Sequence, residues 1–127
     1  MIYSAHMKKV LIIEDDEHIA RIYDIKLKKE SFQTLMAGDG EKGFAMIAKE
    51  KPDLVLLDLM LPKKDGFWVL EEMKKKPALK KVNVIVLSNL GQKADMDRCF
   101  SLGAKEYLVK VDHSIQEVVD TIKKYVA

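Results

Sequence analysis

The stretch VLIIEDD at residues 10–16 decides the fold, because four apolar residues end abruptly at three acidic ones. A short apolar run without polar alternation is typical of a strand that is buried on both faces of a parallel sheet. The runs LVLLD at 54–58 and VIVLS at 84–88 repeat this pattern. We therefore predict three central strands, each of which ends at a polar residue.

The remaining segments alternate between weaker strands and helices. FQTLM at 32–36 and YLV at 107–109 predict strands in less buried positions. Helical patterns fill 17–29, 41–50, 66–75 and 92–102, and the last of these has Met96, Cys99 and Phe100 on its apolar side. A fifth helix follows Ser114, which forms a capping-box pattern with Glu117 three residues later. Five such repeats predict an α/β fold, in which helices cover both faces of a doubly wound, five-stranded parallel sheet.

Composition limits the class of protein. The chain has 127 residues, of which 48% are hydrophobic and 33% charged, as expected for one globular domain. Its net charge of +2 argues against nucleic acid or anionic membrane as a partner. The single cysteine, Cys99, excludes an internal disulfide and a cysteine-based zinc cluster. No apolar run approaches the ~20 residues of a membrane span, so we expect a soluble, cytoplasmic domain.

The first residues look foreign to the domain. A second start, Met7-Lys8-Lys9, follows a short polar stretch that ends in His6. This is the pattern of a tag or cloning remnant at residues 1–6, with the domain at 7–127. The alternative is a genuine N-terminal extension.

The predicted strands place polar residues at one edge of the sheet, where ligands bind in doubly wound folds. These residues are Glu14, Asp15, Asp16, Asp58, Ser88 and Lys110. Clustered carboxylates repel one another unless a cation lies among them, and oxygen ligands without His or Cys favour Mg²⁺. A lysine and a hydroxyl beside that cation suit a phosphoryl group, for which a carboxylate can be the nucleophile. Helix capping explains any one of these acids, but it does not explain the whole set.

Taken together, these motifs resemble the response regulator receiver domain of two-component signalling, which is CheY-like. The resemblance runs from about Lys8 to the C-terminus and rests on VLIIEDD, DLMLPKKDG at 58–66, Ser88 and GAKEYLVK at 103–110. Ser88 and Lys110 follow Asp58 by 30 and 52 residues, which fits the family. The resemblance implies a flavodoxin-like (βα)₅ fold with strand order 2-1-3-4-5.

The resemblance also implies a chemistry. Asp58 would accept a phosphoryl group from a sensor histidine kinase or a histidine phosphotransfer protein. Mg²⁺, or Mn²⁺ in its place, would be bound by Asp15 and Asp58, by Glu14 through water and by the backbone carbonyl of Met60. The protein would turn over no external substrate and would not be an enzyme in that sense.

A switch follows from the same resemblance. Lys110 and Ser88 would each bind a phosphoryl oxygen, and Ser88 would pull its loop inward while Tyr107 fills the space left behind. The fourth helix, fifth strand and fifth helix would form the face that contacts a downstream effector or a second copy. We expect no direct contact of this domain with nucleic acid or a membrane.

Three positions depart from the family pattern or leave it ambiguous. Asp16 can replace Asp15 as the metal ligand, although we prefer Glu14 and Asp15, because Asp16 better suits the start of the next helix. Val111 replaces the usual proline after Lys110, and we expect a trans peptide bond there. Asn89, after Ser88, is larger than usual and is expected to change hydrolysis of the phosphoryl group or donor access.

Two other functions remain open. A receiver-like module that binds partners without phosphorylation stays open because the proline is missing. An aspartyl phosphohydrolase is disfavoured, because Met60 stands where such enzymes carry a general acid. The lysines at 74–76 and 80–81 are read as a solvated face, with an acidic partner as the alternative.

Overall fold

Strands and helices alternate throughout the computed structural model, which describes residues 7–126. The strands are β1 (Lys9–Ile13), β2 (Gln33–Ala37), β3 (Leu54–Leu57), β4 (Asn83–Ser88) and β5 (Glu106–Val109). The helices are α1 (Glu17–Lys29), α2 (Gly40–Glu50), α3 (Gly66–Lys74), α4 (Lys93–Ser101) and α5 (Ile115–Val126), with short 3₁₀ helices at Pro77–Leu79 and Lys110–Asp112. The expected tag or cloning remnant at 1–6 lies outside the described residues, as does Ala127.

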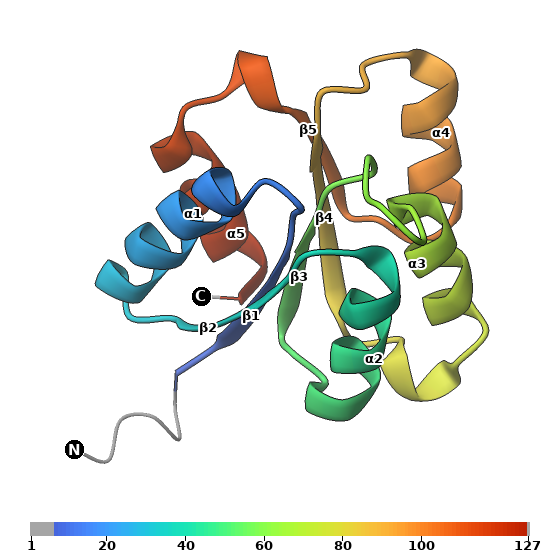
Figure 1. Ribbon diagram of the computed structural model, residues 1–127, viewed down its shortest axis with the longest axis horizontal. Helices are drawn as coiled ribbons and strands as arrows, with labels where there is room; N and C mark the ends of the chain where they lie inside the picture. The colour runs from blue at the N-terminus through green and yellow to red at the C-terminus, as the bar shows by residue number, and fades with distance from the viewer. Residues whose placement is uncertain (1–6, 127) are drawn as a thin grey trace.

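The sheet has the order β2-β1-β3-β4-β5, and every neighbouring pair is parallel. This confirms the predicted α/β fold and its strand order. Helices α1 and α5 cover one face, while α2, α3 and α4 cover the other (Figure 1). Ile13 of β1 lies opposite Leu57 of β3, so the residues after these two strands emerge side by side at one edge.

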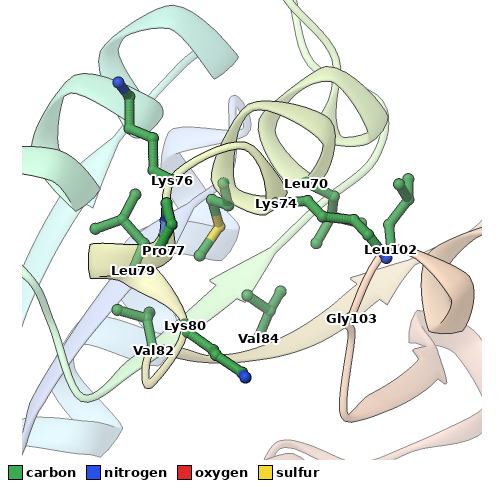
Figure 2. Close-up of a pocket in the computed structure, with 11 residues that line it drawn as sticks. Leu70, Lys74, Lys76, Pro77, Leu79, Lys80, Val82, Val84, Leu102 and Gly103 are labelled. Carbon is green, nitrogen blue, oxygen red and sulfur yellow. The ribbon is translucent and has the colours of Figure 1, made fainter.

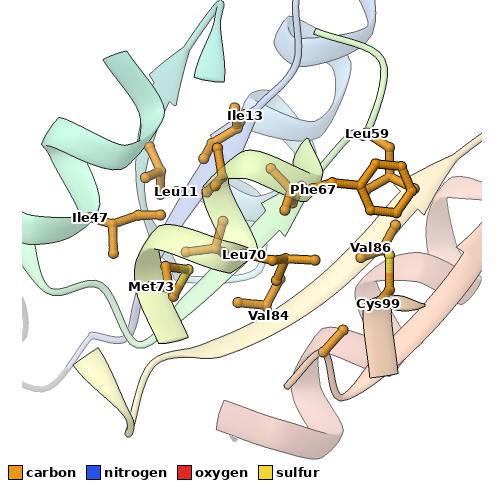
Figure 3. Packing of buried hydrophobic residues seen from close by; sticks show 14 of the residues in the cluster. Leu11, Ile13, Ile47, Leu59, Phe67, Leu70, Met73, Val84, Val86 and Cys99 are labelled. Carbon is orange, nitrogen blue, oxygen red and sulfur yellow. The ribbon is translucent and has the colours of Figure 1, made fainter. Parts of the chain in front are cut away.

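Two apolar cores form because successive side chains of a strand point to opposite faces of the sheet. Leu11 and Ile13 of β1 pack under α2 and α3, in the core shown in Figure 3. Val10 and Ile12 pack instead under α1 and α5. The central strands are therefore apolar on both faces, which explains their uninterrupted hydrophobic runs.

Side-chain caps mark where α2, α3 and α5 begin. Asp39 and Asp65 accept hydrogen bonds from backbone amides in the first turns of α2 and α3. Before α5, the amide of Glu117 donates to Ser114 Oγ at 3.1 Å and the amide of Ser114 donates to Glu117 Oε1 at 2.7 Å, which confirms the capping box. Each cap stabilises its helix by about 1 kcal/mol.

One expectation about α4 is wrong. Cys99 is fully buried, but Phe100 is 48% exposed and does not belong to the core. Helix α4 has one buried residue, Cys99, whereas α3 has five. Its buried stripe is therefore narrower than the apolar pattern suggests, and one large apolar side chain stays at the surface.

The burial of Cys99 predicts a pH-dependent chemical behaviour. Burial raises the pKa of the Cys99 thiol to about 11. Only the thiolate reacts with disulfide reagents, so at about pH 8 the native protein should react with Ellman's reagent at least about 100-fold more slowly than the protein unfolded in guanidinium. The thiol ionises at a lower pH in the unfolded chain than in the folded protein. The free energy of unfolding should therefore fall as the pH rises toward and through the folded-state pKa of Cys99. Equal rates in the two states would contradict the packing of α4.

Within residues 7–126, no helix has the length and apolar character that crossing a membrane requires. The peptide bond between Lys110 and Val111 is trans, as expected, and so is every other peptide bond in this range.

Candidate functional site

Two buried carboxylates lie at the carboxyl edge of the sheet. Glu14 follows β1 and is 7% exposed, and Asp58 follows β3 and is 5% exposed. The amide of Glu14 donates to the carbonyl of Ala37, and the amide of Asp58 donates to that of Ile13, both at 3.0 Å. These bonds extend the sheet ladder by one residue, so the backbone under both carboxylates is held rigidly.

Lys110 brings a positive charge to this pair from the end of β5. Its Nζ donates to Glu14 Oε1 at 2.6 Å and to Asp58 Oδ2 at 2.9 Å. Burial disfavours the charged lysine, but the two hydrogen bonds outweigh it and raise the pKa of Lys110. Burial also raises the pKa of Glu14, against the opposing effect of its hydrogen bond with Lys110. One ammonium therefore bridges two carboxylates taken out of water.

The acidic set has the chemistry of a divalent-cation site. Carboxylate oxygens of Glu14, Asp15 and Asp58 all lie within 4.8 Å of one another. Three carboxylates against one ammonium leave excess negative charge, and a set made only of oxygen atoms suits Mg²⁺. Asp15 is exposed, so the cluster is open to solvent on its side. The residues present therefore fit the predicted metal.

Met60 and Asp16 support the carboxylates through their backbone amides. The amide of Met60 donates to Asp58 Oδ1 at 3.2 Å, and the amide of Asp16 donates to Glu14 Oε2 at 3.1 Å. The carboxylate of Asp16 instead caps α1, accepting from the amides of His18 and Ile19. This geometry favours Asp15 over Asp16 as the metal ligand, while the role of the Met60 carbonyl stays a prediction.

The two neighbouring aspartates should therefore respond differently to substitution. Asp15→Asn should weaken Mg²⁺ binding at least about tenfold and change stability little, because it removes a ligand charge. Asp16→Ala should cost about 1 kcal/mol of stability through loss of the α1 cap, with a smaller effect on Mg²⁺ affinity. Isothermal titration with Mg²⁺ and urea unfolding measure the two effects. The reverse assignment would show that Asp16 is the ligand.

Ser88 and Tyr107 both hold the backbone of Leu90, in the loop between β4 and α4. Ser88 is fully buried at the end of β4, and its Oγ accepts from the Leu90 amide at 3.5 Å, a weak contact. The half-buried Tyr107 donates from its hydroxyl to the Leu90 carbonyl at 2.5 Å. Asn89, which lies between Ser88 and Leu90 in the sequence, is exposed. The sequence did not point to Leu90, because its part is played by backbone atoms alone.

Gly66 is a further residue whose importance the sequence reasoning missed. A Cβ on Gly66 would lie 2.5 Å from the Asp58 carbonyl oxygen and 2.7 Å from Leu59 Cα. Only glycine lets the start of α3 approach the acidic loop so closely. The available signal was the Asp65-Gly66 pair, in which a helix cap precedes a residue without a side chain.

Comparison with known proteins identifies a family that matches most of the chain. Residues 10–123 match the response regulator receiver domain family. The DNA-binding dual master transcriptional regulator RpaA of Synechocystis sp. is 39% identical over 82% of this chain, and the match covers 43% of RpaA. The chain thus spans less than half the length of such curated relatives.

Solved structures show the same fold. A CheY-like receiver domain protein from Methanospirillum hungatei is 25% identical, with a TM-score of 0.86 over 94% of each chain. The BeF₃-activated N-terminal receiver domain of Klebsiella pneumoniae RstA is also 25% identical, with a TM-score of 0.84 over 93% of this chain and 97% of that one. Together with the strand-end acids and the bridging lysine, these matches show that the chain belongs to the response regulator receiver domain family of two-component systems.

Proposed function

We propose that Asp58 accepts a phosphoryl group from a histidine kinase or a histidine phosphotransfer protein in a Mg²⁺-dependent reaction. The observation that carries this proposal is the position of Asp58. Its carboxylate is buried, held by the Lys110 ammonium and the Met60 amide, and placed within a cluster of cation-binding oxygens. A carboxylate that is held in one orientation beside an ammonium and a cation site is suited to attack phosphorus.

In this proposal a carboxylate oxygen of Asp58 forms a bond to phosphorus as the bond from phosphorus to the donor's histidine nitrogen breaks. Lys110 remains beside Asp58 and offsets the charge of one phosphoryl oxygen. Asp15 and Asp58, with Glu14 through water, would hold Mg²⁺, which would supply positive charge to the other phosphoryl oxygens. The Ser88 hydroxyl turns from the Leu90 amide to donate to the phosphoryl group.

The switch that follows is supported by the shared attachment of Leu90. When Ser88 turns toward the phosphoryl group, its hydrogen bond with the Leu90 amide breaks. Leu90 is then held only by its hydrogen bond from Tyr107, so the loop before α4 and the Tyr107 side chain can move together. Phe100 of α4 and Ile115 of α5 are large exposed apolar residues near the affected face. We propose that the face formed by α4, β5 and α5 contacts a downstream effector or a second copy.

We propose that this domain regulates a partner rather than contacting DNA or a membrane itself. RpaA is named as DNA-binding, but the present chain matches only 43% of its length. The near-neutral net charge of +2 gives little attraction to a polyanion. Its free, buried Cys99 agrees with a reducing, cytoplasmic location.

A direct experiment separates this function from its alternatives. The protein is incubated with acetyl phosphate and Mg²⁺, and its intact mass and Trp68 fluorescence are recorded with and without EDTA. The proposal predicts a single labile phosphoryl adduct that EDTA prevents. If no adduct forms, and if the phosphoryl mimic beryllofluoride with Mg²⁺ does not change Trp68 fluorescence, an interaction module that works without phosphorylation is favoured. Continuous release of phosphate from varied phosphate esters would favour a phosphohydrolase. Met60 argues against this function, because its side chain has no acidic proton to give to a leaving group.

Asn89 offers a test of the exposed side of the site. Its amide side chain follows Ser88 and is exposed, and we propose that it affects the access of water or a phosphodonor to Asp58. Asn89→Ala should change the lifetime of the phosphorylated protein by a few-fold, with unfolding unaffected. The decay of the intact-mass adduct measures this lifetime, and decay at the parental rate would remove Asn89 as a modulator.

A further inference from the structure

A groove of about 450 Å³ lies at the end of the sheet opposite the carboxylate cluster. It is bounded by the end of α3, the 3₁₀ helix at Pro77–Leu79, the start of β4 and the loop after α4 (Figure 2). Its apolar lining consists of Leu70, Met73, Pro77, Leu79, Val82, Val84 and Leu102. Val84 is the second residue of β4 and Ser88 is its last, so the groove lies at the other end of this strand from the phosphoryl site.

The rim of the groove is basic. Lys74, Lys76 and Lys80 are among its lining residues, and no acidic residue is. Within residues 7–126, none of these three lysines has a carboxylate oxygen within 4.0 Å. The neighbouring Lys75, by contrast, pairs with Glu72 at 2.8 Å. An apolar groove thus carries positive charge that nothing in its own lining offsets.

Two of the lysines, Lys74 and Lys80, extend along the groove. Lys74 Nζ donates to the Ser101 carbonyl at 2.9 Å, which fixes the ammonium at one end of the groove (Figure 2). Lys80 extends past Val82 and Val84, whereas Lys76 leads away from the groove (Figure 2). Gly103, at φ 105°, leaves the wall open, because a Cβ there would have no atom within 4 Å.

We propose that this groove binds a small amphipathic anion, a medium-chain carboxylate whose apolar chain lies on the groove floor and whose carboxylate contacts Lys74 and Lys80. The volume falls within the roughly 300–1,000 Å³ of small-molecule sites. Only 11 residues line the groove, against the roughly 20–30 on each side of a stable protein interface. Apolar burial supplies affinity, and the lysines, which have no carboxylate partner in the described part of the chain, select the sign of the ligand's charge.

Decanoate below its micelle concentration is a suitable probe, followed by ¹H–¹⁵N NMR on the whole chain. Saturable shifts are expected at the amides of Leu79, Val82, Leu102 and Gly103. Lys80→Gln should weaken binding about 2–5-fold, the effect of losing one exposed ion pair. Lys49→Gln is the control, because Lys49 is an exposed lysine on α2 that does not line the groove, and it should leave the affinity for decanoate unchanged. Decyltrimethylammonium, with the same chain and opposite charge, should bind more weakly.

Further variants keep the test decisive. Lys74→Gln also removes the bond to the Ser101 carbonyl, so Lys80→Gln is the cleaner substitution. Val82→Glu, which puts a carboxylate on the half-buried groove wall, should abolish binding. The proposal is overturned if the NMR shifts map to other residues or if the cationic analogue binds as tightly as decanoate. It is also overturned if neither Lys80→Gln nor Val82→Glu changes the affinity, or if the protein binds only micelles or phosphatidylglycerol vesicles. Asp58→Asn should bind decanoate normally, because the groove does not depend on phosphorylation.

Discussion

Asp58→Asn should abolish formation of the phosphoryl adduct completely. An amide has the shape of the carboxylate but is a poor nucleophile, so the bond to phosphorus cannot form. Incubation with acetyl phosphate and Mg²⁺, followed by intact mass measurement, checks the result. Asp120→Asn, which neutralises an exposed acid of α5, is the matched control and should be phosphorylated normally.

The same variant should be more stable than the parent when metal is absent. Asp58 shares a single ammonium with Glu14, and Asp15 adds a third carboxylate nearby. Neutralising one of them relieves repulsion, and we expect the free energy of unfolding in EDTA to rise on the order of 1 kcal/mol. Urea unfolding measures this change. An adduct of unchanged yield in Asp58→Asn would show that another residue is the acceptor.

Lys110→Met should lower the stability of the metal-free protein more than any other single lysine substitution. Methionine keeps the length and apolar stem, but it leaves the buried carboxylates of Glu14 and Asp58 without their shared cation. Breaking a buried pair in this way costs about 3 kcal/mol. Protonation of Glu14, whose pKa burial already raises, limits the loss and makes it smaller at acidic pH.

Mg²⁺ should restore most of this stability. Without a competing ammonium, the acidic cluster of Lys110→Met should bind Mg²⁺ more tightly than the parent does, so Mg²⁺ should raise its Tm by a larger amount. Lys124→Met, on the exposed side of α5, is the control and should behave as the parent. Thermal unfolding with Mg²⁺ and with EDTA measures both. Equal stabilisation by Mg²⁺ in all three proteins would contradict the proposed balance of charge.

Much of the fold and the candidate site could be predicted because both depend on local sequence patterns. The run at 10–13 is apolar on both faces, and parallel pairing then places Glu14 beside Asp58 at one edge. The sequence left Asp16 open as a metal ligand and only favoured it as a helix cap, and the structure shows that it caps α1. Here the physics within a few residues decides the position of each side chain.

What sequence could not predict depends on contacts between distant elements. Nothing local shows that Lys110 contacts Glu14 as well as Asp58, because this depends on the packing of β5 against the central strands. The attachment of Leu90 uses backbone atoms, which carry no sequence signature. Phe100 was misplaced because an apolar pattern does not say how much of a helix the neighbouring elements cover.

Chemical identification of the phosphorylated residue tests the central claim most directly. Borohydride converts an aspartyl phosphate to homoserine, which marks the acceptor permanently. Trypsin then releases the peptide from Glu50 to Lys63, which contains Asp58 but neither Glu14 nor Asp15. We predict homoserine at position 58 alone, in protein treated with acetyl phosphate and Mg²⁺. Homoserine at another position, or none in protein that carries the adduct, would contradict the assignment of Asp58.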